Sequence, residues 1–477
     1  MGQQGHVRDA GRAGDDAASA ARRRSASPGT CADGGAGLEP RVAIVGGGAS
    51  GLACAVACAR AGGRPTVFEA GARMGRPILA SGNGRCNLTN AHLSPQAYNR
   101  PDFVARALGG RGVADVLSFF DGLGVWCLPD DQGRYYPASR SASSVLDPLL
   151  GACDELGVVL RTGSRVTRLE PPRPGAGATG WVVSHVDRDP AGHGPRGGRA
   201  RARAVREGRE VGEPFDAVVW AAGGGSPSPV LSGLGVRVTE ERPALCPLAT
   251  ETDLVSGLDG VRAPCRLRVL PRAHPDGPAA FDARGEVLFR PYGISGIVTF
   301  DASRRALPGD VVELDLLPDF DERRLRDELV GRTRSHPARY ASPEAALTLL
   351  DGIAHPALGA KVVRVARGRA AGAGLEETAE AAAALLKHYR LRVTGTADPG
   401  HAQVTRGGVA TDQVDPETLG ATAPHLTGLF VCGEALDVDG CCGGFNLSWA
   451  WLSGVTAGEH AARGAREGIG QKGARPC

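Results

Sequence analysis

Residues Arg41–Glu69 have the sequence RVAIVGGGASGLACAVACARAGGRPTVFE. An apolar run meets a glycine turn, a helical Ala/Cys/Leu pattern follows, and a second apolar run ends in an acid. Strand, glycine turn, helix, strand and acid in this order are typical of a dinucleotide-binding unit. Gly46 permits the tight turn, Gly48 lets the backbone approach a pyrophosphate, and Gly51 lets the helix pack close to the strand. The stretch therefore predicts a nucleotide site, with Glu69 accepting the ribose hydroxyls.

Composition limits the possible classes of protein. At 477 residues the chain is long enough for two domains. Its 55 Lys and Arg nearly balance 52 Asp and Glu, so the overall charge does not indicate nucleic acid or an anionic membrane as a partner. No apolar run is long enough to span a bilayer, and we expect no secretory signal. The 12 Cys follow no disulfide framework, which favours a cytoplasmic protein with reduced thiols, and we expect no metal site.

A biased stretch at 171–213 is rich in Gly and Arg. An RNA-binding arm is one interpretation, and a solvated surface loop between two strands is the other. No aromatic residues interleave with the arginines in their densest run, and the flanking segments Gly180–Val186 and Phe215–Trp220 have strand patterns. These features favour the loop, so nucleic acid is not the expected partner.

Composition changes again near Pro243. From there to about His401, strand-like and helical runs alternate without the order of a parallel α/β unit. This pattern predicts an inserted α+β domain. The expected strands are Arg266–Leu270, Val287–Phe289 and Val311–Leu317, and the expected helices are Asp321–Arg334, Pro343–Ile353 and Glu376–Tyr389.

The C-terminal part carries a second strong pattern. Leu429–Cys432 is a buried-strand run, and Gly433 and Glu434 follow it. Gly443 and Gly444 then precede a helix expected from about Leu447 to Ala462. The N–H groups at the start of such a helix would stabilise negative charge on a reduced flavin, if the helix points at one. Glu434, at a strand end, is placed to bind a ribityl or ribose portion.

Three further motifs accompany these patterns. They are GRPILASGNGRCN at Gly75–Asn87, LFRPYGISG at Leu288–Gly296 and GEALDVDGCCGGFNLSWAW at Gly433–Trp451. Together with the opening unit they resemble the aminoacetone-oxidase-like and bile-acid-reductase-like FAD flavoproteins, over roughly residues 41–462. The resemblance implies FAD as cofactor. It also implies an α/β fold in which a Rossmann-like FAD-binding domain, of the type with two dinucleotide-binding domains, is interrupted by an inserted α+β domain.

On this basis we expect a disordered leader at 1–39, FAD-binding segments at 40–242 and 402–466, an insert at 243–401 and a flexible tail at 467–477. The candidate FAD-binding residues come from the glycine turn, the ends of the strands, the SGNGRCN loop and the C-terminal motif. They are Gly46, Gly48, Ala49, Ser50, Gly51, Glu69, Ala70, Ser81, Gly82, Asn83, Gly84, Arg85, Cys86, Asn87, Val166, Ala222, Gly223, Gly433, Glu434, Gly443, Gly444, Phe445 and Asn446.

The sequence departs from the family pattern at three places. Pro77 stands where the family has Lys, and Pro291 replaces a His that could act as an acid or base. Cys441 and Cys442 replace a Tyr-Thr pair, and either redox-active thiols or small packed residues would fit there. Tyr292 and Ser295 are the substrate-side candidates, although a tight turn with a packed aromatic explains them equally well.

Three functions fit the sequence. The favoured one is an FAD-dependent oxidoreductase that uses NAD(P)H as a transient reductant and passes hydride through flavin N5 to a small ketone-like or enone-like acceptor. The second is an FAD-dependent amine oxidase that passes electrons to O₂. The third is a flavin-containing protein that modifies or binds RNA through the arginine-rich loop. The sequence leaves the substrate and the oligomeric state open.

Overall fold

The computed structural model describes residues 39–172, 180–188, 208–225, 228–275, 277–369, 374–398, 400 and 402–473. The expected leader therefore lies outside the described residues, except for its last position. Most of the arginine-rich stretch, at 173–179 and 189–207, also lies outside them. All of the described residues belong to one compact unit of the chain, Glu39–Cys477.

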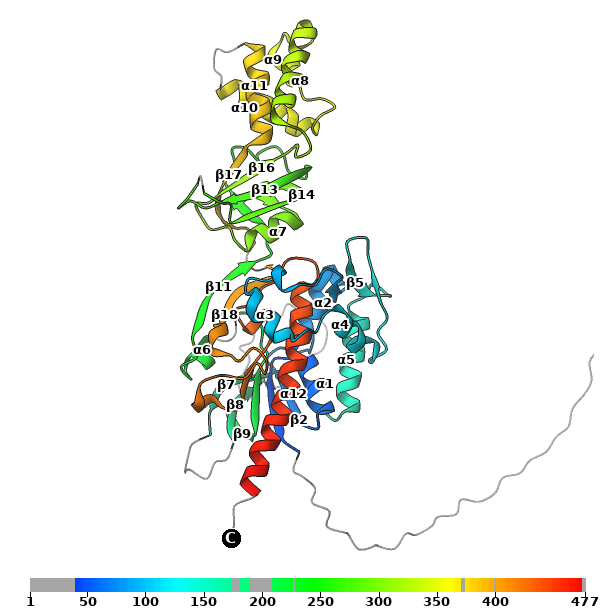
Figure 1. The fold of residues 1–477 in the computed structure, drawn as a ribbon, viewed down its shortest axis with the longest axis vertical. Helices are drawn as coiled ribbons and strands as arrows, with labels where there is room; N and C mark the ends of the chain where they lie inside the picture. Colours follow the sequence, from blue (N-terminus) through cyan, green and yellow to red (C-terminus); the bar gives the residue numbers. More distant parts are fainter. Residues whose placement is uncertain are drawn as a thin grey trace, which may run out of the picture. The chain divides into compact units, whose positions relative to one another are not determined.

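A five-stranded parallel sheet carries the nucleotide-binding unit (Figure 1). Its strand order is β19-β10-β1-β2-β6, and all of its strand pairs are parallel. The expected first two strands and the helix between them are confirmed. The strands are β1 (Arg41–Val45), β2 (Arg64–Glu69), β6 (Val159–Thr162), β10 (Ala217–Trp220) and β19 (Leu429–Val431).

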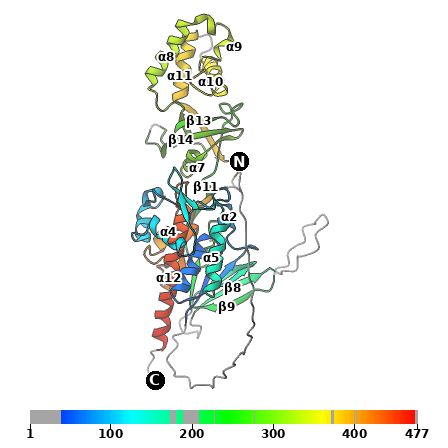
Figure 2. The same cartoon turned by 90° about the vertical axis from the view of Figure 1, so that its right-hand side faces the viewer.

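Helices of small residues cover this sheet. Helix α1 (Ala49–Arg60) packs against α12 (Phe445–Gly473) and α5 (Ser143–Glu155) (Figures 1 and 2). On α12, a Cβ at Gly454 or Gly458 would collide with the backbone carbonyl of Ser50 or Cys54 in α1. These glycines therefore allow the two helix backbones to touch. Helix α12 runs to Gly473, beyond the expected end at Ala462 and into the segment where a flexible tail was expected.

Two small antiparallel sheets accompany the parallel one. The sheet β7-β8-β9 packs on β2 through Phe68, whose ring lies 5.1 Å from that of His185 and 5.8 Å from that of Phe215. The other sheet, β3-β5-β4, follows the SGNGRCN loop. The strands are β3 (Thr89–Asn90), β4 (Cys127–Pro129), β5 (Arg134–Pro137), β7 (Ser164–Glu170), β8 (Trp181–Asp187) and β9 (Val211–Phe215); the helices nearby are α2 (Arg76–Ala80), α3 (Pro101–Leu108), α4 (Val113–Asp121) and α6 (Ser228–Ser232).

The inserted segment builds a closed barrel of six strands, in the order β12-β15-β14-β13-β16-β17. The antiparallel pair β11 and β18 carries the chain into the barrel and back. The barrel has an apolar core of its own, separate from that of the parallel sheet. Its strands are β12 (Leu248–Thr250), β13 (Arg262–Leu270), β14 (Phe281–Arg290), β15 (Gly293–Ser295), β16 (Val311–Asp315) and β17 (Tyr389–Thr396), with β11 (Val238–Ala244) and β18 (Val404–Val409) leading to it.

Two helix predictions in the insert were wrong at their ends. The expected helix Pro343–Ile353 stops at Ala346, since the next amides bond three residues back and the Thr348 hydroxyl takes the Ala345 carbonyl at 2.7 Å. The expected helix ending at Tyr389 stops at Lys387, because Tyr389 pairs with Leu314 in the barrel. The helices are α7 (Ile297–Ser303), α8 (Glu322–Ser335), α9 (Pro343–Ala346), α10 (Pro356–Arg369) and α11 (Leu375–Lys387).

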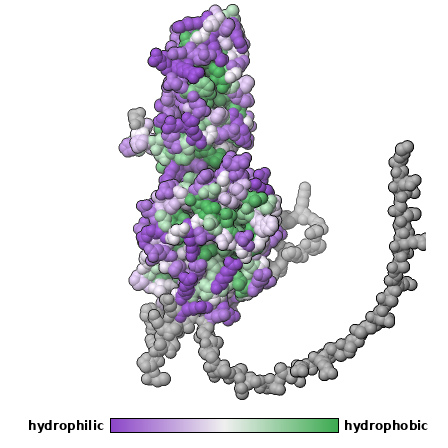
Figure 3. Space-filling view, turned by 45° about the vertical axis from the view of Figure 1, so that its right-hand side comes forward, coloured by the Kyte–Doolittle hydropathy of each residue, from purple (hydrophilic) through white to green (hydrophobic). Residues whose placement is uncertain are grey.

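Hydrophilic side chains and smaller apolar patches share the face shown in Figure 3. Among the described residues, none of the helices is both long and apolar enough to cross a membrane.

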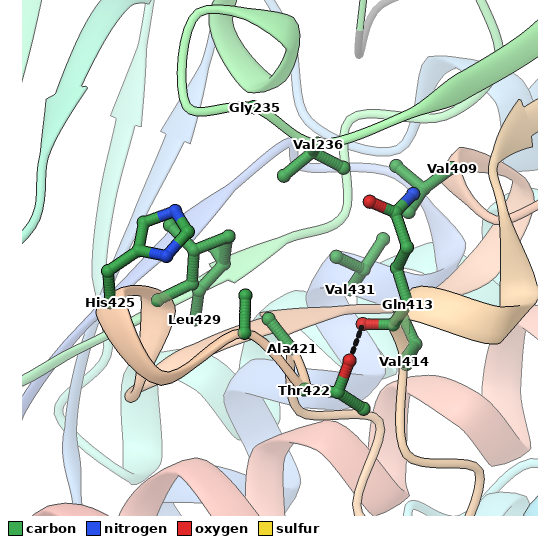
Figure 4. Close-up of a pocket in the computed structure, with 12 residues that line it drawn as sticks. Gly235, Val236, Val409, Gln413, Val414, Ala421, Thr422, His425, Leu429 and Val431 are labelled. Carbon is green, nitrogen blue, oxygen red and sulfur yellow. Dashed lines mark hydrogen bonds between the residues drawn. The ribbon is translucent and has the colours of Figure 1, made fainter.

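A cavity of about 50 Å³ lies beside β19 and is lined mainly by apolar side chains such as Val236, Val409 and Val431 (Figure 4). This volume has room for very few water molecules, so the cavity is too small for a nucleotide.

Candidate active site

The turn between β1 and α1 has the geometry that a pyrophosphate needs. Gly46 has a φ of +109°, and a Cβ there would collide with the backbone of Ala221 and Ala222 at the end of β10. A Cβ on Gly51 would collide with the Gly46 carbonyl. Gly48 is the N-cap of the helix, and apart from Gly48 and its two chain neighbours no described atom lies within 4 Å of where its Cβ would be. The space beside Gly48, at the start of α1, is therefore open, and an anion site at a helix N-terminus would lie there.

The carboxylate of Glu69 lies beside this turn. It accepts hydrogen bonds from the backbone N–H groups of Gly47 at 2.8 Å and Gly71 at 2.6 Å. An ionised carboxylate has about four acceptor positions, so the two oxygens keep capacity for ribose hydroxyls. Ala70 follows directly in the chain. Val166 lies in β7 at an irregularity of its pairing with β8.

The end of β19 meets the first turn of α1. Gly433 has a φ of +67°, and a Cβ there would collide with the Ser50 hydroxyl. Its N–H donates to the Ser453 hydroxyl at 3.0 Å, and its carbonyl accepts from the Trp449 indole at 3.0 Å. The structure thus brings Gly433, Ala222 and the glycine turn together, although they are far apart in sequence. Gly223 follows Ala222 with a φ of +77°.

The SGNGRCN loop uses the left-handed backbone region repeatedly. Gly82 and Gly84 have φ values of +57° and +81°, and the non-glycine residues Asn83 and Cys86 have +55° and +56°. Such conformations are strained for residues with a Cβ and gather at functional sites. Burial raises the pKa of Cys86 to about 12, so this thiol is a packed residue and not a nucleophile. Ser81 donates to the Ile78 carbonyl at 2.7 Å, and the side chain of Arg85 is exposed.

The paired glycines before α12 lie against the segment that follows this loop. Gly443 and Gly444 have φ values of +113° and +105°, and a Cβ on Gly444 would lie 2.7 Å from the Thr89 carbonyl oxygen and 2.8 Å from Asn87 Oδ1. Asn90 Nδ2 donates to the Gly443 carbonyl at 2.8 Å. The side chain of Asn446 holds the preceding loop through both the N–H and the carbonyl of Gly440, at 2.8 and 3.0 Å. Phe445 is the first residue of α12.

Glu434 has a protein partner on strand β18. Its Oε1 accepts from the backbone N–H of Thr405 in β18 at 2.6 Å, and a Cβ on Gly224 would lie 2.6 Å from the same oxygen. Burial raises the pKa of this carboxyl. A role toward ribose or ribityl stays a prediction.

Helix α7 of the insert, which the sequence analysis missed, supplies the contact with the C-terminal motif. Asp301 Oδ1 accepts from the Cys442 N–H at 2.6 Å. Arg304, just after α7, binds Asp439 Oδ1 through Nε at 2.6 Å and contacts Cys441 Sγ at 2.9 Å. Burial raises the pKa of Asp301 to about 6, although the Cys442 N–H and Arg304 oppose the shift. The sequence did carry a signal for this contact, because Asp301 and Arg304 lie one helical turn apart just beyond the LFRPYGISG motif.

The two substrate-side candidates, Tyr292 and Ser295, lie in the segment just before α7. Ser295 is buried in β15 as part of the barrel wall, and its carbonyl accepts from the Thr299 hydroxyl at 3.0 Å. Tyr292 lies in the turn before β15, where its carbonyl accepts from the Thr250 N–H at 3.0 Å. Their contact with a substrate stays a prediction. Asp301 and Arg304 contact Cys442 and Cys441, the two residues before Gly443 and Gly444.

Comparison with known proteins identifies the family. The model of the HI0933-like protein Rossmann domain matches residues 40–177 and 229–460. The chain belongs to this family. It is 32% identical over 444 residues to the 3-dehydro-bile acid delta(4,6)-reductase of Clostridium scindens, covering 88% of this chain and 99% of that protein. It is 27% identical over 431 residues to the ribosomal RNA dihydrouridine synthase of Haemophilus influenzae, covering 86% and 95%. Among solved structures, the 3-ketosteroid-delta4-(5alpha)-dehydrogenase of Rhodococcus jostii RHA1 aligns with a TM-score of 0.40 and 15% identity, covering 89% of this chain and 97% of that one.

The family member described here is an FAD-dependent oxidoreductase with a Rossmann-type FAD-binding fold. Its residues fit the cofactor. Space is open at Gly48, Gly444 packs closely against the Thr89 and Asn87 oxygens, and the buried Asn87 Oδ1 has no hydrogen-bond partner in the described structure. A buried acceptor without a donor is costly, and a ligand N–H group would remove that cost.

Proposed function

We propose that this protein reduces a carbon–carbon double bond conjugated to a carbonyl group in a small organic acceptor, with NAD(P)H as the reductant. The observation that carries the proposal is the 32% identity to a delta(4,6)-reductase along 99% of that enzyme's length. FAD supplies hydride transfer at its N5. The protein residues position the reactants and manage charge and protons.

In this proposal the turn Gly46–Gly51 and Glu69 hold the ADP part of FAD. The SGNGRCN loop, Gly433 and the paired glycines Gly443 and Gly444 hold the flavin end. Support comes from the open space at Gly48, the contact of Gly433 with Ser50 and the contact of Gly444 with the Asn87 and Thr89 oxygens. We also propose residues 40–242 and 402–466 as the FAD-binding part and 243–401 as the insert, in agreement with the two separate apolar cores.

Asp301 is the side chain best placed to exchange a proton in this reaction. It is largely buried, it lies on the barrel side of Cys442, and a pKa of about 6 leaves a fraction of it protonated near neutral pH. In this proposal Asp301 supplies the acid or base group that the family His would provide at the position of Pro291. Arg304, whose positive charge opposes the rise in the pKa of Asp301, is bound to Asp439.

A second candidate function is reduction of uracil in ribosomal RNA. It is favoured by the names of two relatives, at 27% identity each, from Haemophilus influenzae and Escherichia coli. Uracil also presents a double bond conjugated to a carbonyl, so one kind of chemistry would serve both acceptors. The expectation that nucleic acid is not a partner therefore stays open, and the arginine-rich loop that could bind RNA lies mostly outside the described residues.

An anaerobic stopped-flow experiment tests the proposal. The FAD-loaded protein is mixed with NADH or NADPH, and the oxidised-flavin absorption should disappear. The reduced protein is then mixed with a 3-oxo-4-ene steroid acid, with a ribosomal RNA fragment or with oxygen. Fast reoxidation by the steroid supports the first function, and fast reoxidation by the RNA alone supports the second. Reduction by aminoacetone but by neither nicotinamide would contradict both and favour an amine oxidase.

A further inference from the structure

Three arginines gather where the insert meets the C-terminal motif. Arg304 and Arg305 follow the last residue of α7, and Arg406 lies in β18. The guanidinium of Arg406 donates a hydrogen bond to the Arg304 carbonyl, directly before Arg305. The electrostatic interaction of Arg305 with both Arg304 and Arg406 is repulsive and lowers the pKa of Arg305, after burial as the larger cause. Three cationic side chains thus share one small region.

The carboxylates in this region do not balance the three charges. Asp439 is buried, and its Oδ1 binds Arg304 Nε at 2.6 Å. Its Oδ2 lies 3.9 Å from Arg406 Nε and has no hydrogen-bond partner in the described structure. Asp301 is already bound to the Cys442 N–H. Asp439 is thus shared between Arg304 and Arg406, and Arg305 is left without a carboxylate partner among the described residues.

Arg305 is the unusual member of the group. Its side chain is half-buried, yet its guanidinium forms no hydrogen bond or ion pair with any described residue. Other arginines beside the C-terminal motif have carboxylate partners: Arg100 binds Asp437, and Arg134 binds Asp130 at 2.6 Å. Holding a partly desolvated cation between two like charges costs free energy, and a bound anion would offset that cost.

The position of this cluster relates it to the reacting groups. Arg304 Nη1 contacts Cys441 Sγ at 2.9 Å, and Cys442 and the paired glycines follow directly in the chain. Under the proposed function, an acceptor whose reducible end lies at Gly443 and Gly444 would extend past the two cysteines toward Arg305. Guanidinium groups are suited to this task because their planar N–H fork matches a carboxylate in two hydrogen bonds.

We propose that Arg305, with the positive charge of Arg406 beside it, forms an oxyanion subsite that binds the carboxylate of the acceptor. The subsite deepens the proposed function and rests on it, since it assigns the acceptor to the class of organic acids with a conjugated carbonyl. Arg304 serves a different purpose. Its hydrogen bonds to Asp439 and to the carbonyls of Asp439 and Ala97, at 2.8 and 3.3 Å, fix the backbone from which Arg305 extends.

The test measures binding without turnover. A 3-oxo-4-ene steroid acid and its methyl ester are titrated by calorimetry into the oxidised, FAD-loaded protein with no nicotinamide present. Wild-type protein should bind the acid at least about tenfold more tightly than the ester, the scale of one charged hydrogen bond. Arg305→Gln should abolish this preference, and Arg305→Lys should keep part of it. Arg284→Gln is the matched control, because Arg284 is an exposed barrel arginine paired with Asp319 at 2.6 Å.

The possible results separate the subsite from the reaction. Equal affinity of the wild type for acid and ester, or an acid preference that survives Arg305→Gln, would overturn the subsite. So would a loss of affinity for a ribosomal RNA fragment in Arg305→Gln without any acid preference in the wild type, since the arginines would then serve phosphates. An acid preference that depends on Arg305, in a protein that reduces neither steroid, supports the subsite and refutes the proposed reaction. Thermal unfolding of each variant checks that it is folded.

Discussion

Arg304 and Asp439 form an ion pair that joins the insert to the loop before α12, with 2.6 Å between Nε and Oδ1. Their side chains are only 6% and 1% exposed. The two residues are 135 positions apart in sequence, so the pair fixes one part of the fold against another. Because the same guanidinium also contacts Cys441, the pair holds the motif that the FAD-binding proposal depends on.

Breaking this pair should be costly. Arg304→Met leaves the Asp439 carboxylate buried with only Arg406 nearby, and we expect the free energy of unfolding to fall by about 3–5 kcal/mol. Urea denaturation followed by circular dichroism measures the change. Arg262→Met, which removes an exposed pair with Glu286, should cost at most about 1 kcal/mol. An equal fall in the free energy of unfolding for the two variants would show that the buried pair stabilises the fold no more than the exposed pair does.

Gly48 allows cofactor binding to be separated from folding. Its φ is −83° and no atom lies within 4 Å of a Cβ placed there. Gly48→Val should therefore fold normally but fill the space that the pyrophosphate needs, giving a colourless protein. The absorption spectrum of the purified variant and its thermal unfolding measure the two effects. A yellow variant with one FAD per chain would contradict the assignment of the turn.

Two other glycines serve as controls for that variant. Gly395 in β17 also has no atom within 4 Å of its Cβ position, so Gly395→Val should keep both the fold and the colour. Gly51→Val places a Cβ against the Gly46 carbonyl and should lower the unfolding temperature whether FAD is present or not. A cofactor-free Gly395→Val would mean that colour reports general damage and not the site.

The β1–α1–β2 unit was predictable because its constraints are local. Gly46, Gly48 and Gly51 are needed by one turn, and the strands beside it are short apolar runs. The barrel was not predictable in the same way, because closure depends on β12 pairing with β17 across more than a hundred residues. The contact of Asp301 with Cys442 spans 141 positions, so the charged pair Asp301 and Arg304 in the sequence does not reveal its partner. Glu434 was located correctly on a strand end, but its bond to Thr405 depends on where β18 returns from the insert.

Glu69 should contribute to FAD affinity through its remaining acceptor positions. Glu69→Gln keeps one acceptor oxygen for the Gly47 and Gly71 N–H groups, and its NH₂ group cannot accept from a ribose hydroxyl. We expect FAD binding to weaken by about 1–3 kcal/mol. Quenching of flavin fluorescence on titration into the apoprotein measures it. An unchanged affinity would mean that Glu69 serves the turn and not the ribose.

Asp301 should make stability depend on pH between about 4 and 6. Its pKa in the folded protein is raised from 3.8 to about 6, chiefly by burial, so the folded state holds the proton longer than the unfolded state does. Stability from this group is then greatest at low pH and decreases as pH rises through that window. Asp301→Asn keeps an oxygen for the Cys442 N–H and should raise the free energy of unfolding at pH 7 by about 1–3 kcal/mol.

The comparison of two pH values isolates this effect. Burial also raises the pKa of Glu434, so the wild type alone would combine both groups. The difference between Asp301→Asn and the wild type cancels the Glu434 contribution, and it should shrink when urea denaturation is repeated at pH 4. A difference that stays constant from pH 4 to pH 7 would show that the carboxyl of Asp301 is not shifted.

Cys441 and Cys442 should behave as packed thiols and not as a redox pair. Burial, followed by the charge of Asp301, raises the pKa of Cys442 to about 12, and burial also raises that of Cys441 despite the nearby Arg304. Since only the thiolate attacks alkylating reagents or disulfides, both thiols should be unreactive at pH 8 in the folded protein. Labelling with iodoacetamide and peptide mass spectrometry measures this, with urea-unfolded protein as the reactive reference.

Cys442→Ser should leave flavin reduction by NAD(P)H at the wild-type rate, because hydride transfer needs no thiol. Rapid labelling of either cysteine, or a reduced protein that takes up four electrons per FAD in the wild type but two in Cys442→Ser, would instead establish a dithiol that exchanges electrons with the flavin.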